Sequence, residues 1–156
     1  MTAQHANTVI ATNRKAFHDF DVLQKLEAGI ALQGTEVKSL REGHITLTGN
    51  HIRIENGDAI LYGVKIEPYT FGNRFNHDPA RPRRLLLHKR EIRHLQAAAE
   101  QQGSTLVALK CYFRHQKVKV EVGICRGRKA ADKREVLKRK TADREAERAI
   151  AAVRKR

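Results

Sequence analysis

Histidines are the main side chains of this sequence that are able to bind a metal ion or to react. His88 and His94 lie six positions apart, which places them on different faces of a helix. No residue near His77 completes a metal-ligand set with it. Glycine-rich phosphate loops and the G-x-S-x-G nucleophile motif are absent from the sequence. The sequence therefore predicts no catalytic residue, no cofactor and no metal site. We expect a protein that is not an enzyme, with its histidines at the surface or against RNA.

The two cysteines, Cys111 and Cys125, are the other candidate ligands or nucleophiles. Two cysteines are too few for a zinc site or for a disulfide framework. Because free cysteine is among the most buried residue types, we expect both to be buried or half-buried free thiols.

Basic residues offer a different chemistry, the binding of a polyanion. The chain has 156 residues, a length typical of one domain, and its 31 Lys and Arg exceed its 17 Asp and Glu to give a formal net charge of +14. This charge favours an acidic partner, with nucleic acid considered before a membrane surface. A solvated surface without a partner is the alternative. The clusters before residue 127 contain Asn13, Arg14, Lys15, Lys38, Arg41, Arg83, Arg84, His88 and Lys89.

Aromatic residues near these clusters suggest which nucleic acid would bind. Phe17, Tyr69 and Phe71 are close to basic residues in the sequence and are able to stack on unpaired bases. Aromatic residues make up only 5% of the chain, however, and no strand carries paired aromatic residues. Docking on a folded RNA, recognised by its shape and phosphates, is therefore favoured over generic single-strand binding.

The last 31 residues, from Arg126, are the most basic segment, with 13 basic and 5 acidic residues. Neither proline nor glycine follows Gly127. Apolar residues recur at helical spacing, at Ala146, Ala149, Ile150 and Val153. Alanine makes up half of this stripe, which is too thin to dock firmly on a core, and isolated helices are marginal in water. We expect residues 128–156 to form a basic tail that is flexible when free and helical in an RNA-walled channel.

Strands are the main elements expected between the N-terminus and residue 103. Most of residues 17–32 is predicted to be a strand that leads into a short helix between Thr35, its N-cap, and Gly43. Asn56-Gly57 is a strong hairpin signal, which predicts paired strands at 52–55 and 59–66.

A polar loop over residues 72–84 is expected next along the chain. A helix follows within residues 88–103, because Ile92, Leu95 and Ala99 share one face and Gly103 ends the pattern.

The best-defined element is a hairpin over residues 104–127 with its turn at His115-Gln116. In this register one face is apolar throughout, pairing Phe113 with Val118, Cys111 with Val120, Leu109 with Val122 and Val107 with Ile124. The other face pairs Tyr112 with Lys119 and Lys110 with Glu121.

Together these elements predict five to seven antiparallel strands with two short helices. A small closed or nearly closed barrel would hide the edges of such a sheet. No run of about 18 or more apolar residues is present, so no membrane span is expected. The first residues lack the apolar core of a signal peptide, which favours the cytoplasm.

Three long strings in this sequence closely resemble the SsrA-binding protein (SmpB) family. They are NRKAFHDFDVLQKLEAGIALQGTEVKSLREG, GNRFNHDPARPRRLLLHKREI and GRKAADKRE, and they extend in the same order from about Asn13 to Arg139. The resemblance implies a mainly β fold with short helices, an antiparallel barrel like the OB-fold, over residues 13–127. A loose arm over residues 1–12 would precede it, and the basic tail over residues 128–156 would follow it.

This resemblance also implies a function. Members of the family bind the tRNA-like domain of transfer-messenger RNA (tmRNA) and act with it in trans-translation, the rescue of ribosomes stalled on messages without a stop codon. The protein replaces the anticodon arm that this RNA lacks. Its tail is loose when free and orders in the decoding centre and empty message channel of the ribosome. Elongation factor Tu would be met only indirectly, through tmRNA, and we expect a monomer.

Three residues carry the RNA-binding role implied by the resemblance: Asn13 in NRKA, Glu27 in EAGI and Leu86 in LLLHKR. Asn13 is able to donate to and accept from a base edge or a 2′-OH. Glu27 would accept from base amino or imino groups, although an ion pair with a nearby Lys or Arg is the alternative. Leu86 would pack on an unstacked base or ribose, with a place in the barrel core as its alternative. The basic residues Lys38, Arg41, Arg83 and Arg84 would hold phosphates.

In the tail, the resemblance implies ribosome contacts for Gly127, Arg128, Lys129, Asp132, Lys133, Arg134, Lys138 and Arg139. The family often has an aromatic residue or His before the DKR string, whereas this chain has Ala131. A base-stacking contact expected there is therefore not available in that form. A structural protein bound permanently to ribosomal RNA would have a similar composition and remains the alternative function. A nuclease would require a metal-ligand set that the sequence lacks.

Overall fold

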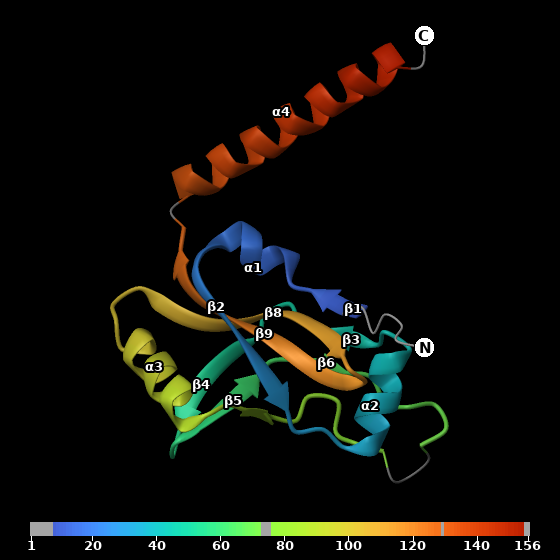
Figure 1. Cartoon of the computed structure of the whole chain (residues 1–156), viewed down its shortest axis with the longest axis vertical. Coiled ribbons are helices and arrows are strands. Elements are labelled where there is room, and N and C mark those ends of the chain that lie inside the picture. Colours follow the sequence, from blue (N-terminus) through green and yellow to red (C-terminus); the bar gives the residue numbers. More distant parts are fainter. Residues whose placement is uncertain (1–7, 73–75, 129, 155–156) are drawn as a thin grey trace.

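The computed structural model describes residues 8–72, 76–128 and 130–154 of the chain. Its strands are β1 (Thr8–Thr12), β2 (Phe20–Ile30), β3 (Ile45–Thr46), β4 (His51–Glu55), β5 (Asp58–Tyr62), β6 (Lys65–Ile66), β7 (Arg83–Leu86), β8 (Ser104–Arg114) and β9 (Lys117–Gly127). Its helices are α1 (Arg14–Asp19), α2 (Gly34–Arg41), α3 (Lys89–Ala99) and α4 (Ala130–Arg154). The elements from β1 to β9 make one body, and α4 projects away from it (Figure 1).

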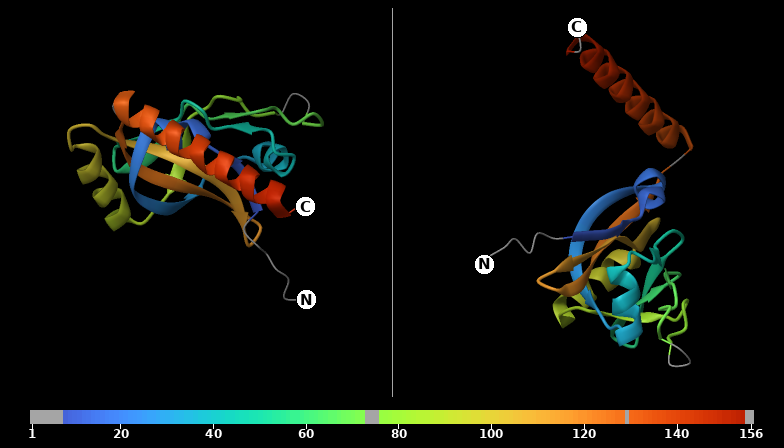
Figure 2. Two further views of the ribbon diagram at one scale, coloured as in Figure 1. Left: turned by 90° about the horizontal axis from the view of Figure 1, so that it is seen from above. Right: turned by 90° about the vertical axis from the view of Figure 1, so that its right-hand side faces the viewer.

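Seven of the strands form one sheet in the order β1-β8-β9-β2-β7-β5-β4, and β3 pairs with β6 in a second sheet. All described pairings are antiparallel. The large sheet curls strongly, with α3 beside one end of the curl and α2 beside the other (Figures 1 and 2). This arrangement confirms the predicted mainly β fold with short helices.

Asn50, which immediately precedes β4, links one end of the curled sheet to β8. Its side-chain Oδ1 accepts from the Ala108 N–H at 2.8 Å, and its Nδ2 donates to the Ala108 carbonyl at 3.0 Å. Nδ2 also donates to the Leu47 carbonyl at 2.6 Å, and Asn50 is only 6% exposed. The amide therefore pairs with Ala108 as a neighbouring strand would, and it draws the sheet toward a closed barrel.

The core lies inside this curl. It is built from the inward residues of β2, β8 and β9, together with residues of the shorter strands and of α2 and α3, including Ala28, Leu40, Leu61, Leu85, Leu95, Leu106, Val120 and Val122. A smaller cluster of Ala16, Val107, Leu109 and Cys125 packs against Phe17, Phe20 and Val22 beneath α1. Both cysteines are buried and free, as predicted, and burial raises the pKa of Cys111 to about 12 and that of Cys125 to about 11.

The predicted β8–β9 hairpin is confirmed in its turn and in the residue pairs nearest to the turn. His115 and Gln116 have φ of 50° and 65°, as a tight hairpin turn requires. Register partners include Phe113 with Val118, Cys111 with Val120, Tyr112 with Lys119 and Lys110 with Glu121. The predicted pairs of Leu109 and Val107 are wrong, because a bulge between Ala108 and Lys110 shifts the register. Val122 then lies opposite Ala108, and Leu109 turns toward the smaller cluster.

The predicted loose arm is wrong for Thr8–Thr12, which form β1 on the free edge of β8. The edge backbone of β8 offers these residues hydrogen-bond partners that a sequence pattern does not reveal. Residues 1–7 lie outside the described residues. The strand predicted over residues 17–32 is confirmed for Phe20–Ile30, and α1 takes the residues before it.

Three further boundaries differ from the prediction. Helix α2 begins at Gly34, and its N-cap is Gln33, whose backbone N–H donates to the Glu36 carboxylate at 2.8 Å. The Asn56-Gly57 hairpin is confirmed, but its second strand ends at Tyr62. In the expected polar loop over residues 72–84, Arg83 and Arg84 already belong to β7.

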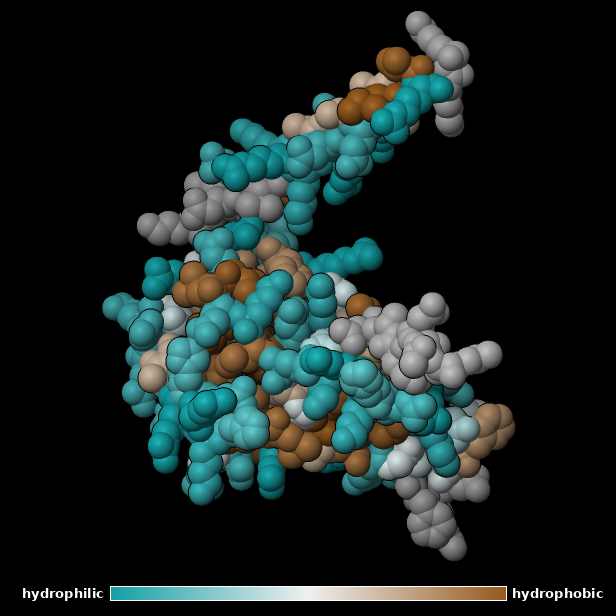
Figure 3. All heavy atoms as spheres, in the orientation of Figure 1, coloured by the Kyte–Doolittle hydropathy of each residue, from teal (hydrophilic) through white to brown (hydrophobic). Residues whose placement is uncertain are grey.

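Helix α4 is hydrophilic along most of its length, and Figure 3 shows apolar residues near its far end. Leu137, Ile150 and Val153 are 48%, 56% and 72% exposed, so these three apolar side chains of the helix are not packed in a core. No helix among the described residues is long and apolar enough to cross a membrane.

Candidate nucleic-acid interface

The outward side of β2, β8 and β9 brings polar residues from distant parts of the sequence into rows. In one row Lys110 lies opposite Glu121, and Glu121 lies opposite Glu27. The next row contains Tyr112, Lys119, Gly29 and Leu86, on the four neighbouring strands β8, β9, β2 and β7. We call this side the outer sheet face.

A hollow of about 470 Å³ opens on this face where Gly29 has no side chain. Glu27 and Lys119 lie on one side of the hollow and Arg84, Leu86 and His88 lie on its other sides. Leu86 is 48% exposed, so the alternative that it belongs to the barrel core is wrong. The strand alternation of β7 explains this, because Arg83 and Leu85 point inward and Arg84 and Leu86 point outward.

The carboxylate of Glu27 is held by two residues of β8. The Tyr112 hydroxyl donates to Oε2 at 2.5 Å, and Arg114 Nη1 donates to Oε1 at 2.9 Å and to Oε2 at 3.0 Å. The ion-pair alternative for Glu27 is therefore confirmed, with Arg114 as the partner. The hydrogen bond from Tyr112, and then those from Arg114, hold the pKa of Glu27 below its ordinary value. Burial and the bond to Glu27 raise the pKa of Tyr112.

Basic residues border the same hollow. Arg84 Nε lies 3.8 Å from Asp58 Oδ1, and its side chain is 59% exposed. His88 is the N-cap residue of α3, whose first residue is Lys89, and both are exposed. The Glu91 carboxylate accepts from the His88 backbone N–H at 3.0 Å, which fixes the start of the helix beside the hollow. The structure thus brings Glu27, Arg84, Leu86 and His88 together, with Lys89 adjacent in sequence.

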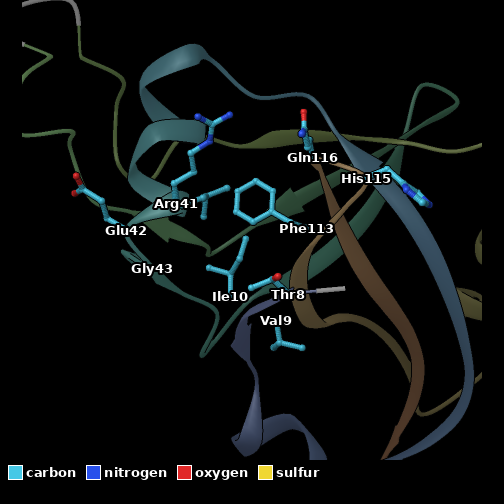
Figure 4. Close-up of a pocket in the computed structure, with 10 residues that line it drawn as sticks. Thr8, Val9, Ile10, Arg41, Glu42, Gly43, Phe113, His115 and Gln116 are labelled. Carbon is cyan, nitrogen blue, oxygen red and sulfur yellow. The ribbon is translucent and has the colours of Figure 1, made fainter. Parts of the chain in front are cut away.

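Four other predicted residues lie exposed on short helices away from this hollow. Arg14 and Lys15 lie on α1, and Lys38 lies on α2 with its Nζ 5.5 Å from the centroid of the Tyr69 ring. Arg41, at the end of α2, lines a larger hollow of about 830 Å³ that shares no lining residue with the first. Figure 4 shows Arg41 and Phe113 facing this larger hollow.

The structure corrects the prediction that Asn13 contacts RNA through its side chain. Asn13 is 3% exposed, and its Oδ1 accepts from the Ala16 N–H at 3.1 Å as the N-cap of α1. Its Nδ2 donates to the Leu47 and Ala108 carbonyls at 3.4 and 3.3 Å. This side chain therefore fixes α1, and with it Arg14, against the barrel.

Arg83 also departs from its predicted role as a phosphate ligand, because its side chain is completely buried. Its Nε donates to Glu36 Oε2 at 2.5 Å, and its other nitrogens donate to the carbonyls of Val64, Arg81 and Pro79. Arg81 reaches Glu36 Oε1 from the other side. Arg83 therefore ties β7 to α2 inside the fold and has no surface to offer to RNA.

The first tail residues are attached to the body. Gly127 is the last residue of β9, opposite Phe20. The Arg128 backbone N–H donates to the Asp19 carbonyl at 2.9 Å, and Arg128 Nε donates to Asp21 Oδ1 at 2.9 Å. With its side chain 15% exposed, Arg128 is an anchor at the root of the tail.

The remaining predicted tail residues follow this anchor. Lys129 lies outside the described residues. Asp132 and Lys133 lie within α4, where Arg134, Lys138 and Arg139 are exposed. These exposed basic side chains are available to a polyanionic partner.

Sequence reasoning missed Gly29, Tyr112, Arg114 and Lys119 as parts of the interface. The hairpin pattern does place Tyr112 and Lys119 together on an outward face, and that signal was available. It does not reveal that β2 lies beside β9, which brings Glu27 to the same place. His77 is also a correction to the expected surface histidines, because it is 5% exposed and bonded to Thr35 and to the Ile66 carbonyl.

The side chains of the interface offer contacts for binding a partner molecule. Among the described residues, no group of three or more His, Cys, Asp and Glu side chains is arranged to hold a metal ion. The outer sheet face instead offers hydrogen-bond acceptors at Glu27, cations at Arg84, Arg114 and Lys119, and an exposed apolar contact at Leu86. Such a combination suits a folded RNA, whose phosphates and unstacked bases present complementary groups.

Comparison with known proteins gives one consistent result. The family model described as "SmpB protein" matches residues 10–152. The chain is 53% identical over 144 residues to an SsrA-binding protein of Carboxydothermus hydrogenoformans, covering 92% of this chain and 97% of the relative. It is 50% identical over 142 residues to one of Geobacillus thermodenitrificans, covering 91% and 92%.

Comparison with solved structures agrees. The fold matches a chain in a structure described as "tmRNA-SmpB: a journey to the center of the bacterial ribosome" with a TM-score of 0.66. The match has 50% sequence identity and covers 77% of this chain and 85% of that one. A family match across the barrel and most of α4, with identities of this size over nearly whole chains, establishes that this protein belongs to the SmpB family.

Proposed function

We propose that this protein is the RNA-binding adaptor of trans-translation. In this proposal the barrel binds the tRNA-like domain of tmRNA, and the α4 segment enters the decoding centre and empty message channel of a stalled ribosome. The relatives are SsrA-binding proteins, and the similar solved structure is described in terms of tmRNA, SmpB and the bacterial ribosome. Elongation factor Tu is met only through tmRNA, the protein acts as a monomer without enzymatic activity, and its place of action is the cytoplasm.

The observation that carries this proposal is the hollow at Gly29. An exposed Leu86, a carboxylate at Glu27 and an exposed Arg84 border one concave site on a face that also presents Lys119. An apolar side chain packs against an unstacked base, a carboxylate accepts from a base amino group or a ribose hydroxyl, and an arginine holds a phosphate. The convergence of an exposed leucine, a carboxylate and an arginine on one hollow supports a binding role for this face.

A binding titration tests this function. The affinity for the tRNA-like domain of tmRNA is compared with that for an RNA hairpin of equal length at increasing salt concentrations. Charge attraction weakens equally for both RNAs as salt rises, whereas contacts to a particular folded RNA do not. We expect a preference for the tRNA-like domain that survives moderate salt.

The converse result would count against the proposal. Equal affinities that fall together as salt rises would mean that the outer sheet face is only a basic surface. A ribosome profile then addresses the remaining alternative. An adaptor is sparse and enriched on stalled ribosomes, whereas a structural ribosomal protein is present in equal number with the subunits.

A further inference from the structure

Tyr112 and Arg114 lie two residues apart on β8, and both point to the Glu27 carboxylate on β2. β9 lies between these two strands, so both side chains span a complete strand to reach it. Arg114 is 48% exposed and Glu27 34% exposed, so the group is accessible from solvent. The three side chains form a unit that we call the Glu27 cluster.

We propose that Tyr112 and Arg114 are positioning residues that hold Glu27 with a single open acceptor position, and that this arrangement determines the selectivity of the interface for its RNA. The inference rests on the proposed function, in which the bound RNA is the tRNA-like domain of tmRNA. It extends that function by adding two residues and by stating the kind of RNA group that Glu27 reads.

The count of hydrogen-bond positions supports this inference. A carboxylate offers about four acceptor positions, two on each oxygen. Tyr112 and Arg114 both donate to Oε2, which fills that oxygen, and Arg114 also donates to Oε1. One position on Oε1 is left. Glu27 is therefore arranged to accept from one donor, such as a single base N–H or a 2′-OH, and not from the paired N–H groups of a guanine edge, which require both oxygens.

The neighbouring charges explain why these two partners are needed. Glu27 lies directly opposite Glu121 across β2 and β9, and like charges in such a pair repel. Lys25 Nζ lies 3.9 Å from Glu121 Oε1, Lys110 is the register partner of Glu121, and Lys119 adds positive charge near Glu27. Tyr112 and Arg114 bond Glu27 itself, which fixes its carboxylate beside these charges and holds its pKa below the ordinary value. Fixed partners also reduce the ordering that binding must impose on the side chain.

The chemistry of Arg114 also suits a second role, that of a direct phosphate ligand. That role would weaken binding of every RNA when Arg114 is changed, because phosphates are common to all of them. A role through Glu27 would weaken only the selective complex. Selectivity, and not affinity alone, therefore separates the two roles.

The experiment is a double-mutant cycle with two RNAs. Affinities of the full-length protein and of Y112F, E27Q and the double variant are measured for the tRNA-like domain and for a plain hairpin of equal length. Y112F removes only the hydroxyl, and we expect an affinity loss of about 5- to 10-fold for the tRNA-like domain and less than about 2-fold for the hairpin. In the E27Q background the same change should have a smaller effect, because Tyr112 acts through the Glu27 carboxylate, of which glutamine keeps only one acceptor oxygen.

The chain offers a matched control in Tyr62, whose hydroxyl donates to Glu55 Oε2 at 2.8 Å on the β4–β5 hairpin. Y62F removes the same kind of Tyr–Glu bond outside the outer sheet face and should leave both affinities unchanged. R114K tests the second partner, because a lysine keeps the charge but loses the fixed planar geometry of arginine. R114K should keep the hairpin affinity and lose part of the preference for the tRNA-like domain.

Three results would overturn the inference. They are an unchanged affinity of Y112F for the tRNA-like domain, equal losses of Y112F on both RNAs, and additive losses in the double variant. Circular dichroism and thermal unfolding of each variant separate these outcomes from a loss of fold. If the unaltered protein shows no preference for the tRNA-like domain, the proposed function itself fails, and that result is visible before any variant is compared.

Discussion

Gly29 on β2 and Leu86 on β7 are register partners, and a Cβ atom placed on Gly29 would lie 3.1 Å from the Leu86 Cβ. This separation is tighter than ordinary van der Waals contact, so any other residue at position 29 pushes against the strand that carries Leu86. Gly29 also lines the hollow beside Glu27. One glycine thus allows both the close strand approach and the concavity of the interface.

Replacing Gly29 with alanine is expected to fill the floor of the hollow and displace Leu86. The barrel should still fold, with a destabilisation on the order of 1 kcal/mol from overpacking. Affinity for the tRNA-like domain should fall by about 5-fold, while affinity for a plain hairpin should not change. Binding titrations of both RNAs with G29A measure this difference.

Gly34 provides the matched control for this substitution. It begins α2, and no atom lies within 4 Å of an added Cβ. G34A should leave RNA binding unchanged and raise stability by about 0.5 kcal/mol, because alanine restricts the unfolded chain more than glycine does. An undiminished affinity of G29A for the tRNA-like domain would show that RNA does not use the hollow.

The adjacent arginines of β7 should respond to substitution in opposite ways. Arg83 is buried against Glu36, whereas the side chain of Arg84 is 59% exposed. R83M leaves a buried carboxylate with one of its partners missing, which is expected to destabilise the fold by about 3–5 kcal/mol. R84M should change stability by less than about 0.5 kcal/mol but lower RNA affinity and reduce the salt dependence of binding by about one counterion. Chemical denaturation and salt titrations distinguish them, and equal effects on stability would contradict the assigned orientations.

Glu36 should make the stability of the protein dependent on pH. Burial raises the pKa of Glu36, but hydrogen bonds from Arg81, the Gln33 backbone and Arg83 outweigh it and hold the pKa below its ordinary value. Because the folded-state pKa is the lower one, the ionised carboxylate contributes stability above the unfolded-state pKa and loses it as pH falls through the folded-state pKa.

The measurement is the difference in unfolding free energy between the unaltered protein and E36Q. This difference should be largest near neutral pH and should shrink as pH is lowered from about 5 toward 3. Glu27, whose pKa is also lowered, is present in both proteins, so its contribution cancels in the comparison. A difference that does not vary with pH would mean that the Glu36 charge adds nothing to stability.

The elements that were predicted correctly are those marked by a short, local pattern in the sequence. Asn56-Gly57 and His115-Gln116 marked their hairpins because tight turns constrain the backbone of two adjacent residues. The apolar stripe of α3 marked its helix for a similar reason, since one face meets the core. Each signal is contained within about twenty residues and needs no knowledge of distant strands.

Other features depended on contacts between distant residues. The β1 strand forms because an edge of β8 is available about one hundred residues later, and the Leu109 bulge forms where Asn13 and Asn50 bond Ala108. Arg83 and Arg84 have the same chemistry in the sequence, and only the orientation of β7 decides which of them is buried. The family resemblance therefore predicted part of the interface. The place of Gly29 beside Leu86 follows only from the order of the strands in the sheet.

Asn50 is expected to be one of the most sensitive polar positions in the barrel. N50A removes both hydrogen bonds to Ala108 and the bond to the Leu47 carbonyl. It leaves the buried Ala108 N–H without its partner, which costs about 1–3 kcal/mol, and the lost bonds add to this. Thermal unfolding and hydrogen exchange of the Ala108 amide measure the effect. T48A, at an exposed neighbouring position, is the control and should change stability little. An N50A protein of unaltered stability would mean that the barrel closes without this amide.

The tail should be separable from the barrel at one residue. Arg128 is bonded to Asp19 and Asp21, whereas α4 beyond it exposes its described side chains, so a truncation that removes residues 129–156 should leave the unfolding free energy unchanged. At moderate salt this variant should also keep its affinity for the tRNA-like domain, because the outer sheet face is intact. It should fail to support tagging on stalled ribosomes, since no basic segment is left for the message channel.

Removing Arg128 as well is the sharper comparison, and its lost bonds should destabilise the barrel by about 1–2 kcal/mol. A large loss of RNA affinity on removal of residues 129–156 would contradict the division, because it would place part of the RNA-binding surface on α4.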